Sequence, residues 1–262
     1  MRSFPRDLFA EWAAVKRRIQ KAGRVALFLD FDGTLAPIAP WPDRVRLSPA
    51  KRQQLERIVK KGVLVGIVSG RNLDDLRERV PVDQIWKAGA SGYFFSRPGG
   101  AVTTVLQPAQ RSEISKIGRR LGRELAEVAG ALVELKQAMV AVHYRHVSTK
   151  DYPKVMAALR RLLLAHPSLH AIPGKKVWEI LPNSHVDKWT AIQHILRTAQ
   201  NSHRHRWLIF HLGDDRADER VFSNMKGIAI AVGKRRRTAA EYFLKSQADV
   251  GKFLRRFCEA VK

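Results

Sequence analysis

The stretch Val25-Ala26-Leu27-Phe28-Leu29-Asp30-Phe31-Asp32-Gly33-Thr34-Leu35 decides the fold of this chain. Its first five residues are apolar, which is typical of a strand buried on both faces of a parallel sheet. Two carboxylates one residue apart, Asp30 and Asp32, follow the run, and Gly33 then permits a tight turn. Carboxylates placed in this way can hold a divalent cation and supply a nucleophile, so the stretch predicts phosphoryl-transfer chemistry.

Apolar runs of the same kind recur along the chain and alternate with amphipathic stretches. Further strands are predicted over 63–68, 85–88, 207–212 and 228–232, and helices over 49–61, 73–80 and 186–198. The alternation predicts an α/β fold with a doubly wound, Rossmann-like core. Ligands of such sheets bind beyond the carboxyl ends of the strands, where Asp30, Ser69 and Asp214 follow their runs.

Residues 107–182 interrupt this rhythm and predict an inserted α+β domain. The pattern indicates helices over 112–128 and 152–165, alternating strands over 131–145, and further strands near Leu169 and Val177. The core domain then consists of 24–106 and 183–262. Residues 1–23 carry apolar side chains at helical spacing and predict an N-terminal amphipathic helix, and Asp249 is expected to be the N-cap of a C-terminal helix.

Composition limits the class of protein. With 262 residues and 45% hydrophobic content, the chain can bury a substantial core. No apolar run reaches the roughly 20 residues that span a bilayer, and the N-terminal stretch lacks the features of a secretory signal. The single cysteine, Cys258, cannot close an intramolecular disulfide, so we expect a cytoplasmic protein; we also expect a monomer.

The charge is strongly positive: 48 Lys and Arg against 24 Asp and Glu give a formal net charge of +24. Such a field attracts anionic ligands and polyanions nonspecifically. The basic residues are dispersed, with the densest run at Lys234-Arg235-Arg236-Arg237, and neither aromatic-interleaved basic strips nor zinc-finger spacing accompany them. We therefore expect nonspecific polyanion association and no specific nucleic-acid site.

The chemistry of the first motif favours two successive displacements at phosphorus. Asp30 is the predicted nucleophile, and Asp32 is placed to give a proton to the leaving oxygen and later to take one from water. Mg²⁺, held by Asp30 and Asp32, would shield the approach to a phosphate dianion. Backbone amides near Gly33 and the hydroxyl of Thr34 can face the phosphoryl oxygens. The alternative is an Asx turn after a strand.

The segment after the second predicted strand extends this site. It contains Ser69, Gly70 and Arg71, which predict a catalytic hydroxyl at Ser69 and a phosphate-binding helix start at Gly70 and Arg71. An ordinary turn is the alternative.

The acidic loop Gly213-Asp214-Asp215-Arg216-Ala217-Asp218-Glu219 predicts a metal ligand at Asp214. Asp215 and Asp218 would act nearby, holding metal-bound water or orienting Lys188. Lys188 would bring a compact positive charge to the phosphoryl group. The alternative for this loop is an acidic first turn of a helix, favoured by the helix dipole.

Taken in order, Asp30-Phe31-Asp32-Gly33-Thr34, Ser69, Lys188 and Gly213-Asp214-Asp215 resemble the four motifs of the haloacid dehalogenase superfamily. Within it the chain is similar to the trehalose-6-phosphate phosphatase family from about Arg24 onward. The closer likeness rests on six segments: Leu29 to Ile38, Val68-Ser69-Gly70-Arg71, Glu134-Leu135-Lys136, Val142-His143-Tyr144-Arg145, Gly174-Lys175-Lys176-Val177-Trp178-Glu179-Ile180 and Gly213-Asp214-Asp215-Arg216-Ala217-Asp218-Glu219.

That resemblance implies that the insert is a cap closing over the core. It implies sugar binding by Glu134, Lys136, Arg145 and Glu179, with His143 and Lys175 as weaker candidates. Without the resemblance, Glu134 and Lys136 would simply share the solvent face of a strand. The chain departs from the family pattern in the loop 89–93, at Trp189 and at Ala217.

The sequence thus predicts a Mg²⁺-dependent phosphatase that acts on trehalose 6-phosphate through an aspartyl-phosphate at Asp30. Another sugar-phosphate phosphatase of the superfamily, for example one acting on a glucosylglycerol phosphate, is the nearest alternative. A nonenzymatic polyanion-binding protein on the same scaffold is the alternative from a different class.

Overall fold

A computed structural model describes residues 4–39, 45–136, 138–173, 176–183, 186–199, 207–233 and 237–262. The chain divides into two compact units. Unit 1 comprises Met1–Thr103 and Val186–Lys262, and unit 2 comprises Thr104–His185. Three residues of the basic run, Lys234, Arg235 and Arg236, lie outside the described residues, as do Gly174 and Lys175.

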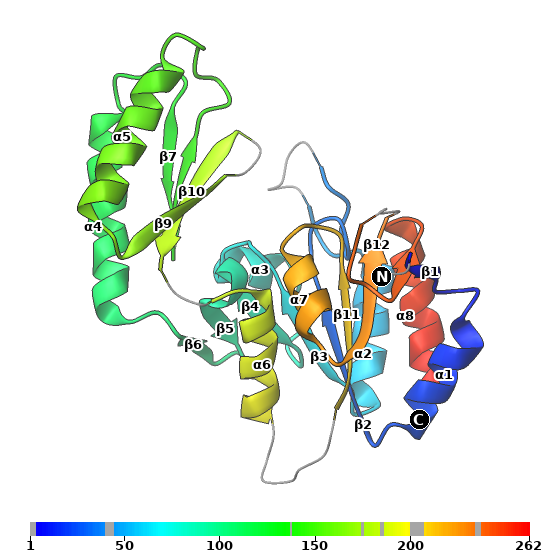
Figure 1. Ribbon diagram of the computed structural model, residues 1–262. Coiled ribbons are helices and arrows are strands. Elements are labelled where there is room, and N and C mark those ends of the chain that lie inside the picture. The colour runs from blue at the N-terminus through cyan, green and yellow to red at the C-terminus, as the bar shows by residue number, and fades with distance from the viewer. Residues whose placement is uncertain are drawn as a thin grey trace. The chain divides into compact units, whose positions relative to one another are not determined.

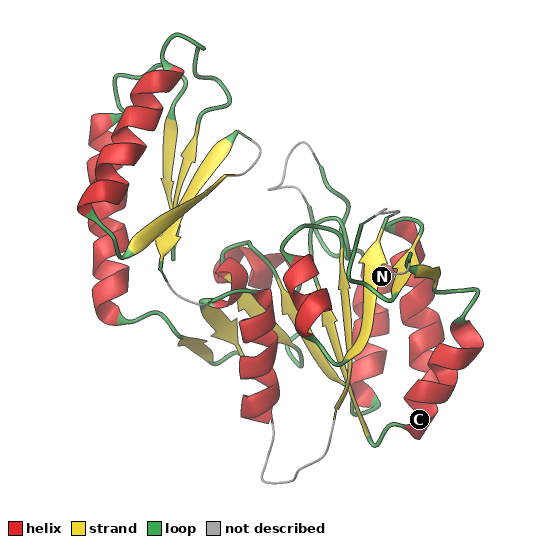
Figure 2. Cartoon of the chain, viewed as in Figure 1, coloured by secondary structure: helices red, strands yellow, loops and turns green. Residues whose placement is uncertain are grey.

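Unit 1 is built on one large sheet (Figure 1, Figure 2). In the described part of the chain it has nine strands, which lie side by side in the order β1 (Arg6–Asp7), β13 (Tyr242–Leu244), β12 (Gly227–Val232), β11 (Trp207–Gly213), β2 (Arg24–Leu29), β3 (Leu64–Val68), β4 (Trp86–Gly89), β5 (Phe94–Ser96) and β6 (Val102–Thr104).

The strands from β1 to β4 are all parallel, and β5 is antiparallel to β4. The chain winds outward from β2 in both directions, through β3 and β4 on one side and from β11 to β12 and β13 on the other. The doubly wound α/β core predicted from the sequence is therefore confirmed, and the point where the order reverses lies at β2 and β11.

Helices cover both faces of this sheet (Figure 1). Alternate residues of β2 explain why: Val25, Leu27 and Leu29 belong to one buried cluster, and Ala26 and Phe28 to another on the opposite face. The first cluster contains residues from α1 (Trp12–Lys21), α2 (Pro49–Lys60), α3 (Leu73–Arg79) and α8 (Ala248–Ala260), and the second from α6 (Lys188–Ala199) and α7 (Asp218–Asn224).

Unit 2 is a smaller two-layer α+β structure. Its four-stranded antiparallel sheet has the order β7 (Leu132–Leu135), β8 (Val140–His143), β10 (Val177–Pro182) and β9 (Leu169–Pro173). The helices α4 (Pro108–Glu124) and α5 (Tyr152–Ala165) share a buried apolar cluster with the face of the sheet that carries Val140, Val142 and Ile180. The opposite face of the sheet has no helix of unit 2 packed on it among the described residues.

Three expected element bounds need correction. The N-terminal helix begins only at Trp12, because Arg6 and Asp7 instead pair with β13 as an edge strand and Phe4 is 75% exposed. Helix α4 begins at Pro108, four residues before the expected start, with a capping box formed by Gln107 and Gln110. Asp249 lies within the first turn of α8 and accepts hydrogen bonds from Ser246 instead of being the N-cap.

Cys258 is a free cysteine. No helix in the described ranges combines the length and the apolar character that crossing a bilayer requires.

A glycine in β3 tests how tightly the sheet packs. A Cβ added at Gly66 would lie 2.7 Å from the ring of Phe28, whose side chain is fully buried. We expect Gly66→Ala to lower the free energy of unfolding by about 1–3 kcal/mol through overpacking, measured by urea denaturation.

Gly122 in α4 is the matched control, because a Cβ there would meet nothing within 4 Å. Gly122→Ala should raise stability by up to about 1 kcal/mol, since alanine is the better helix former. A Gly66→Ala variant as stable as the parent would show that Phe28 has room to move.

Candidate active site

The polar residues that follow β2, β3 and β11 come together at the carboxyl end of the sheet. The backbone N–H of Asp30 donates to Leu212 O at 2.9 Å, and that of Ser69 donates to Ala88 O at the same distance. These bonds extend the strand pairing by one residue, so that the loops begin side by side. Asp214 follows β11 directly, so three segments far apart in the sequence meet at one edge.

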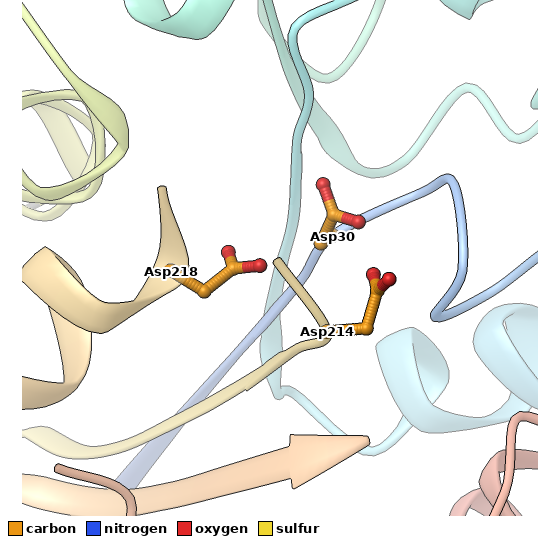
Figure 3. Close-up of side chains that lie close together, drawn as sticks. All are labelled: Asp30, Asp214 and Asp218. Carbon is orange, nitrogen blue, oxygen red and sulfur yellow. The ribbon is translucent and has the colours of Figure 1, made fainter. Parts of the chain in front are cut away.

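Three carboxylates converge at this edge. Each of Asp30, Asp214 and Asp218 offers an oxygen, and these oxygens lie within 4.8 Å of one another. Figure 3 shows the three side chains, which come from the ends of β2 and β11 and from the start of α7. Asp30 and Asp218 are buried, and Asp214 is half-buried. Carboxylate oxygens are the ligands that hard divalent cations prefer, so the group could hold such an ion.

Lys188, the first residue of α6, lies among these carboxylates and is 3% exposed. Its Nζ donates to Asp30 Oδ1 at 2.8 Å, to Asp218 Oδ1 at 2.9 Å and to Asp215 Oδ1 at 3.3 Å. Three contacts match the three N–H bonds of an ammonium group. Burial alone would lower the pKa of Lys188, but the carboxylates outweigh it and hold the pKa above its usual range, so the side chain is positively charged.

Asp218 is the most completely bonded carboxylate of the group. Its Oδ1 accepts from Lys188 and from His211 Nε2, each at 2.9 Å, and its Oδ2 accepts from the backbone N–H of Asp215 at 3.1 Å. Although burial opposes ionisation, Lys188 and His211 keep the pKa of Asp218 well below its usual range. Asp218 therefore holds its neighbours in place as an anion.

Asp30 and Asp214 differ from Asp218 because burial dominates their electrostatics. Burial raises the pKa of Asp30 well above its usual range, although the Lys188 ammonium opposes the shift. Burial also raises the pKa of Asp214, against a hydrogen bond from Thr34. Two carboxyl groups whose negative charge is poorly solvated would both be stabilised by a cation between them.

The turn after Asp32 is shaped around Asp214. Gly33 has a φ of 81°, and a Cβ there would lie 2.1 Å from Asp214 Oδ2, so both the backbone conformation and the space require glycine. Thr34 is fully buried, and its Oγ1 donates to Asp214 Oδ1 at 3.1 Å. The turn thus fixes the orientation of the Asp214 carboxylate.

The carboxylate of Asp32 lies outside the group of three. Arg71 donates to it twice, from Nε to Oδ2 and from Nη2 to Oδ1, each at 2.6 Å. Arg71 also donates to Asp75 at 2.8 Å, and Asp75 accepts from Arg79, a buried side chain that donates to Val45 O at 2.7 Å. The predicted acid/base residue is therefore part of a chain of alternating charges that runs into the core.

Ser69 and Gly70 begin the loop that carries Arg71. Ser69 is 1% exposed, and its Oγ accepts from the backbone N–H of Arg71 at 3.2 Å. The altered loop 89–93 lies against this segment: Ser91 N donates to Ser69 O at 2.9 Å, and Ala90 N donates to Arg71 O at 2.6 Å. Trp189 packs in the apolar cluster under α6 and α7.

Unit 2 brings together three of its four predicted sugar-binding residues. The Nζ of Lys136 lies 3.8 Å from Glu134 Oε2 and 3.7 Å from Glu179 Oε1, and Glu134 Oε2 also lies 3.0 Å from His143 Nε2. Glu134 and Glu179 both pair in register with Ala141, which places them on the sheet face away from α4 and α5. Arg145 is exposed just beyond β8.

Sequence reasoning missed three residues that support these groups: His211, Asp75 and Arg79. A signal existed for His211, because a polar residue inside the apolar run Trp207 to Leu212 calls for a partner. Asp75 and Arg79 follow Arg71 at intervals of four, which is the spacing of ion pairs on a helix face.

Known proteins share this combination of sequence and architecture. The sequence matches the trehalose-phosphatase family over residues 28–248. It is 33% identical to probable trehalose-phosphate phosphatase 3 of Oryza sativa subsp. japonica, over 90% of this chain and 70% of that protein. It is 31% identical to probable trehalose-phosphate phosphatase D of Arabidopsis thaliana, over 91% of this chain and 68% of that protein.

A solved structure shares the fold. The C-terminal domain of Candida albicans trehalose-6-phosphate phosphatase superposes with a TM-score of 0.73 and 18% identity, covering 98% of both chains. The family match extends over most of the core and through unit 2, and the fold agrees with it. The chain therefore belongs to the trehalose-phosphatase family and is a phosphatase.

Proposed function

We propose that this enzyme removes the phosphate from trehalose 6-phosphate. The observation that carries the proposal is the arrangement at the end of β2, where Asp30 lies 2.8 Å from the buried Lys188 ammonium and beside Asp214. Family membership supports trehalose 6-phosphate as the substrate, because the relatives from Oryza and Arabidopsis carry that activity in their names.

The reaction runs in two displacements at Asp30. A carboxylate oxygen of Asp30 attacks phosphorus, the bond from phosphorus to the sugar oxygen breaks, and Asp32 gives that oxygen a proton. Water then attacks the aspartyl-phosphate while Asp32 takes its proton, which releases inorganic phosphate and restores Asp30. Lys188 stabilises the negative charge that builds up on the phosphoryl oxygens.

The residues present fit Mg²⁺. Asp30 and Asp214 would hold the ion, because both supply carboxylate oxygens and burial penalises their charge in the absence of a cation. When bound, Mg²⁺ neutralises charge on the phosphate and on the two carboxylates. Asp218 is less suited to direct ligation since both of its oxygens already accept hydrogen bonds, and we assign it with Asp215 to the surrounding layer.

The hydrogen bonds from Arg71 to Asp32 affect how Asp32 could act as an acid. A carboxylate that accepts two hydrogen bonds of 2.6 Å from a guanidinium has both oxygens engaged, so Arg71 must release Asp32 before that carboxyl group can exchange a proton with the leaving oxygen. A phosphate group offers Arg71 the same paired-oxygen geometry as a carboxylate. Substrate binding would therefore draw Arg71 toward the phosphoryl oxygens and free Asp32, which is consistent with substrate-binding roles for Arg71, Gly70 and the Ser69 hydroxyl.

Unit 2 is the proposed source of sugar specificity. Glu134, Lys136 and Glu179 form a cluster of charges on the sheet face that no helix in the described part of unit 2 covers. Carboxylate acceptors and an ammonium donor in one cluster can bind several hydroxyls at once. Arg145 completes the proposed set by its position after β8.

Phosphate release from a panel of sugar phosphates tests the substrate. Trehalose 6-phosphate should give the largest kcat/KM. A higher kcat/KM for a glucosylglycerol phosphate would make that compound the substrate instead. Salt-dependent polyanion binding without any phosphate release would refute an enzymatic function.

Asp30→Asn tests the nucleophile. The variant should lose roughly 10⁴-fold or more in kcat, since the amide is not nucleophilic, and its melting temperature should show that it is folded. Asp74→Asn, at an exposed carboxylate in α3, is the control and should keep full activity. Residual activity of more than a few per cent in Asp30→Asn would rule out the assignment.

Glu179→Ala tests the sugar-binding cluster. We expect kcat/KM for trehalose 6-phosphate to fall about 10–100-fold, as for loss of a charged hydrogen-bonding group, with little change for a small aryl phosphate. Glu127→Ala, an exposed acid elsewhere in unit 2, should alter neither substrate. Equal losses on both substrates would remove Glu179 from sugar recognition.

Removal of divalent cations tests the metal. EDTA should abolish activity and excess Mg²⁺ should restore it. Because a ligand that binds only the folded state raises stability, Mg²⁺ should also raise the melting temperature of the parent, and Asp214→Asn should weaken that rise. Full activity in excess chelator would contradict the proposal.

A further inference from the structure

We propose that His211 is a positioning residue for catalysis: its Nε2–H holds the Asp218 carboxylate in the orientation that keeps Lys188 against Asp30. This inference rests on the proposed function of Asp30 and Lys188 and adds a residue to it.

His211 occupies a position where an apolar side chain would be expected. It lies in β11 between Phe210 and Leu212, on the face of the sheet toward α7, and is completely buried. Its ring packs against Phe222 of α7, with ring centroids 5.5 Å apart. An imidazole in such a place is costly unless it is hydrogen-bonded, so its polar contact accounts for its presence.

That contact is with Asp218. His211 Nε2 lies 2.9 Å from Asp218 Oδ1, and an ionised carboxylate can only accept, so the ring donates from Nε2. The same oxygen accepts from Lys188 Nζ at 2.9 Å. His211 and Lys188 therefore share one acceptor atom, and the donor fixed in the strand determines where that atom lies.

The surroundings leave Asp218 little freedom. Its Oδ2 accepts from Asp215 N, and Asp215 Oδ1 in turn accepts from Asp218 N at 3.0 Å. A Cβ at Gly213 would lie 2.0 Å from Asp218 Cγ, so glycine is the residue that lets the carboxyl group approach β11. The carboxylate is thus clamped between β11 and the start of α7.

A continuous chain of contacts links this clamp to the nucleophile. It runs from His211 Nε2 to Asp218, from Asp218 to Lys188 Nζ, and from Lys188 Nζ to Asp30 Oδ1 at 2.8 Å. Loss of the first donor removes the contact from β11 to Asp218 Oδ1, the oxygen that Lys188 also contacts, so this oxygen is held less firmly. The acceptor that positions the Lys188 ammonium can then move, so the position of this ammonium beside Asp30 and the phosphoryl group becomes less well defined.

The kinetic experiment compares three variants. His211→Leu removes the donor, and we expect kcat on trehalose 6-phosphate to fall about 10–100-fold with KM within about 3-fold, because the lost interaction acts in the transition state. His211→Gln keeps an N–H near the position of Nε2 and should retain kcat within about 5-fold of the parent. Phe222→Leu disturbs the packing against the ring without removing the donor and should leave kcat unchanged.

A second measurement reads the position of Lys188 without using activity. In the parent, Lys188 is buried and bound to three carboxylates, so it should resist an amine-reactive reagent such as acetic anhydride, as followed by peptide mass spectrometry. Labelling of Lys188 should rise about 5-fold or more in His211→Leu, since a loosened ammonium is more accessible, and should stay at the parental level in His211→Gln and Phe222→Leu.

The outcomes separate this inference from the proposed function. If folded His211→Leu keeps both parental kcat and parental labelling, or if folded His211→Gln is as impaired as His211→Leu, the positioning role is wrong. Failure of His211→Leu to fold leaves the decision to His211→Gln, which must keep both properties. If the parent does not hydrolyse trehalose 6-phosphate, the proposed function fails, and the labelling comparison still decides whether His211 holds Lys188.

Discussion

The ion pairs of the buried Lys188 ammonium are the interactions on which the candidate active site depends. An isolated charge in a protein interior costs several kcal/mol, and only close, well-directed partners offset that cost. Lys188 has three, Asp30, Asp215 and Asp218, contributed by the end of β2 and by the acidic loop after β11. The two buried carboxylates, Asp30 and Asp218, also need the ammonium, whereas Asp215 is exposed. Removal of Lys188 would therefore leave the buried carboxyl groups of Asp30 and Asp218 without their cationic partner.

The parallel sheet is what brings these groups together. Asp30 and Asp214 are separated by most of the chain, yet β2 and β11 are neighbours in register, so both strands end at the same level. Helix α6, which precedes β11 in the chain, begins with Lys188 at the same edge of the sheet. Helix α7, which follows β11, begins with Asp218 beside it. His211 reaches this group from inside the sheet because it lies on the face of β11 that α6 and α7 cover. Catalytic geometry and core packing are consequently determined by the same strand alternation.

The sequence predicted the residues that follow strands better than the contacts between side chains. Strands β2 and β3 are short apolar runs, and β11 is one that only His211 interrupts. Such runs between helical patterns indicate buried parallel strands, so Asp30, Ser69 and Asp214 could be placed at one edge in advance. The edge strand β1 has two residues and no such pattern, so its pairing with β13 depends on tertiary contacts that sequence periodicity does not show. The pairing of Asp32 with Arg71, instead of with the other carboxylates, could not be predicted either, because it depends on how Asp75 and Arg79 orient the guanidinium. His211 gave a signal, an imidazole within an apolar strand, but its partner Asp218 is seven residues away and only the fold shows that they meet.

The strong positive charge of the protein and the acidic groups of the candidate active site would affect substrate association and substrate admission separately. A net charge of +24 creates a long-range field that raises the local concentration of a phosphate dianion and speeds its encounter with the enzyme. Inside the site acidic groups outnumber basic ones, because Asp30, Asp215 and Asp218 all contact the single Lys188 and Asp214 lies beside Asp30 and Asp218. These carboxylates would repel a phosphate dianion, and the proposed divalent cation would offset that repulsion, so attraction at long range and admission at short range would have separate causes. Salt should therefore weaken the long-range attraction, whereas admission to the site would depend on the proposed cation and on the placement of Lys188.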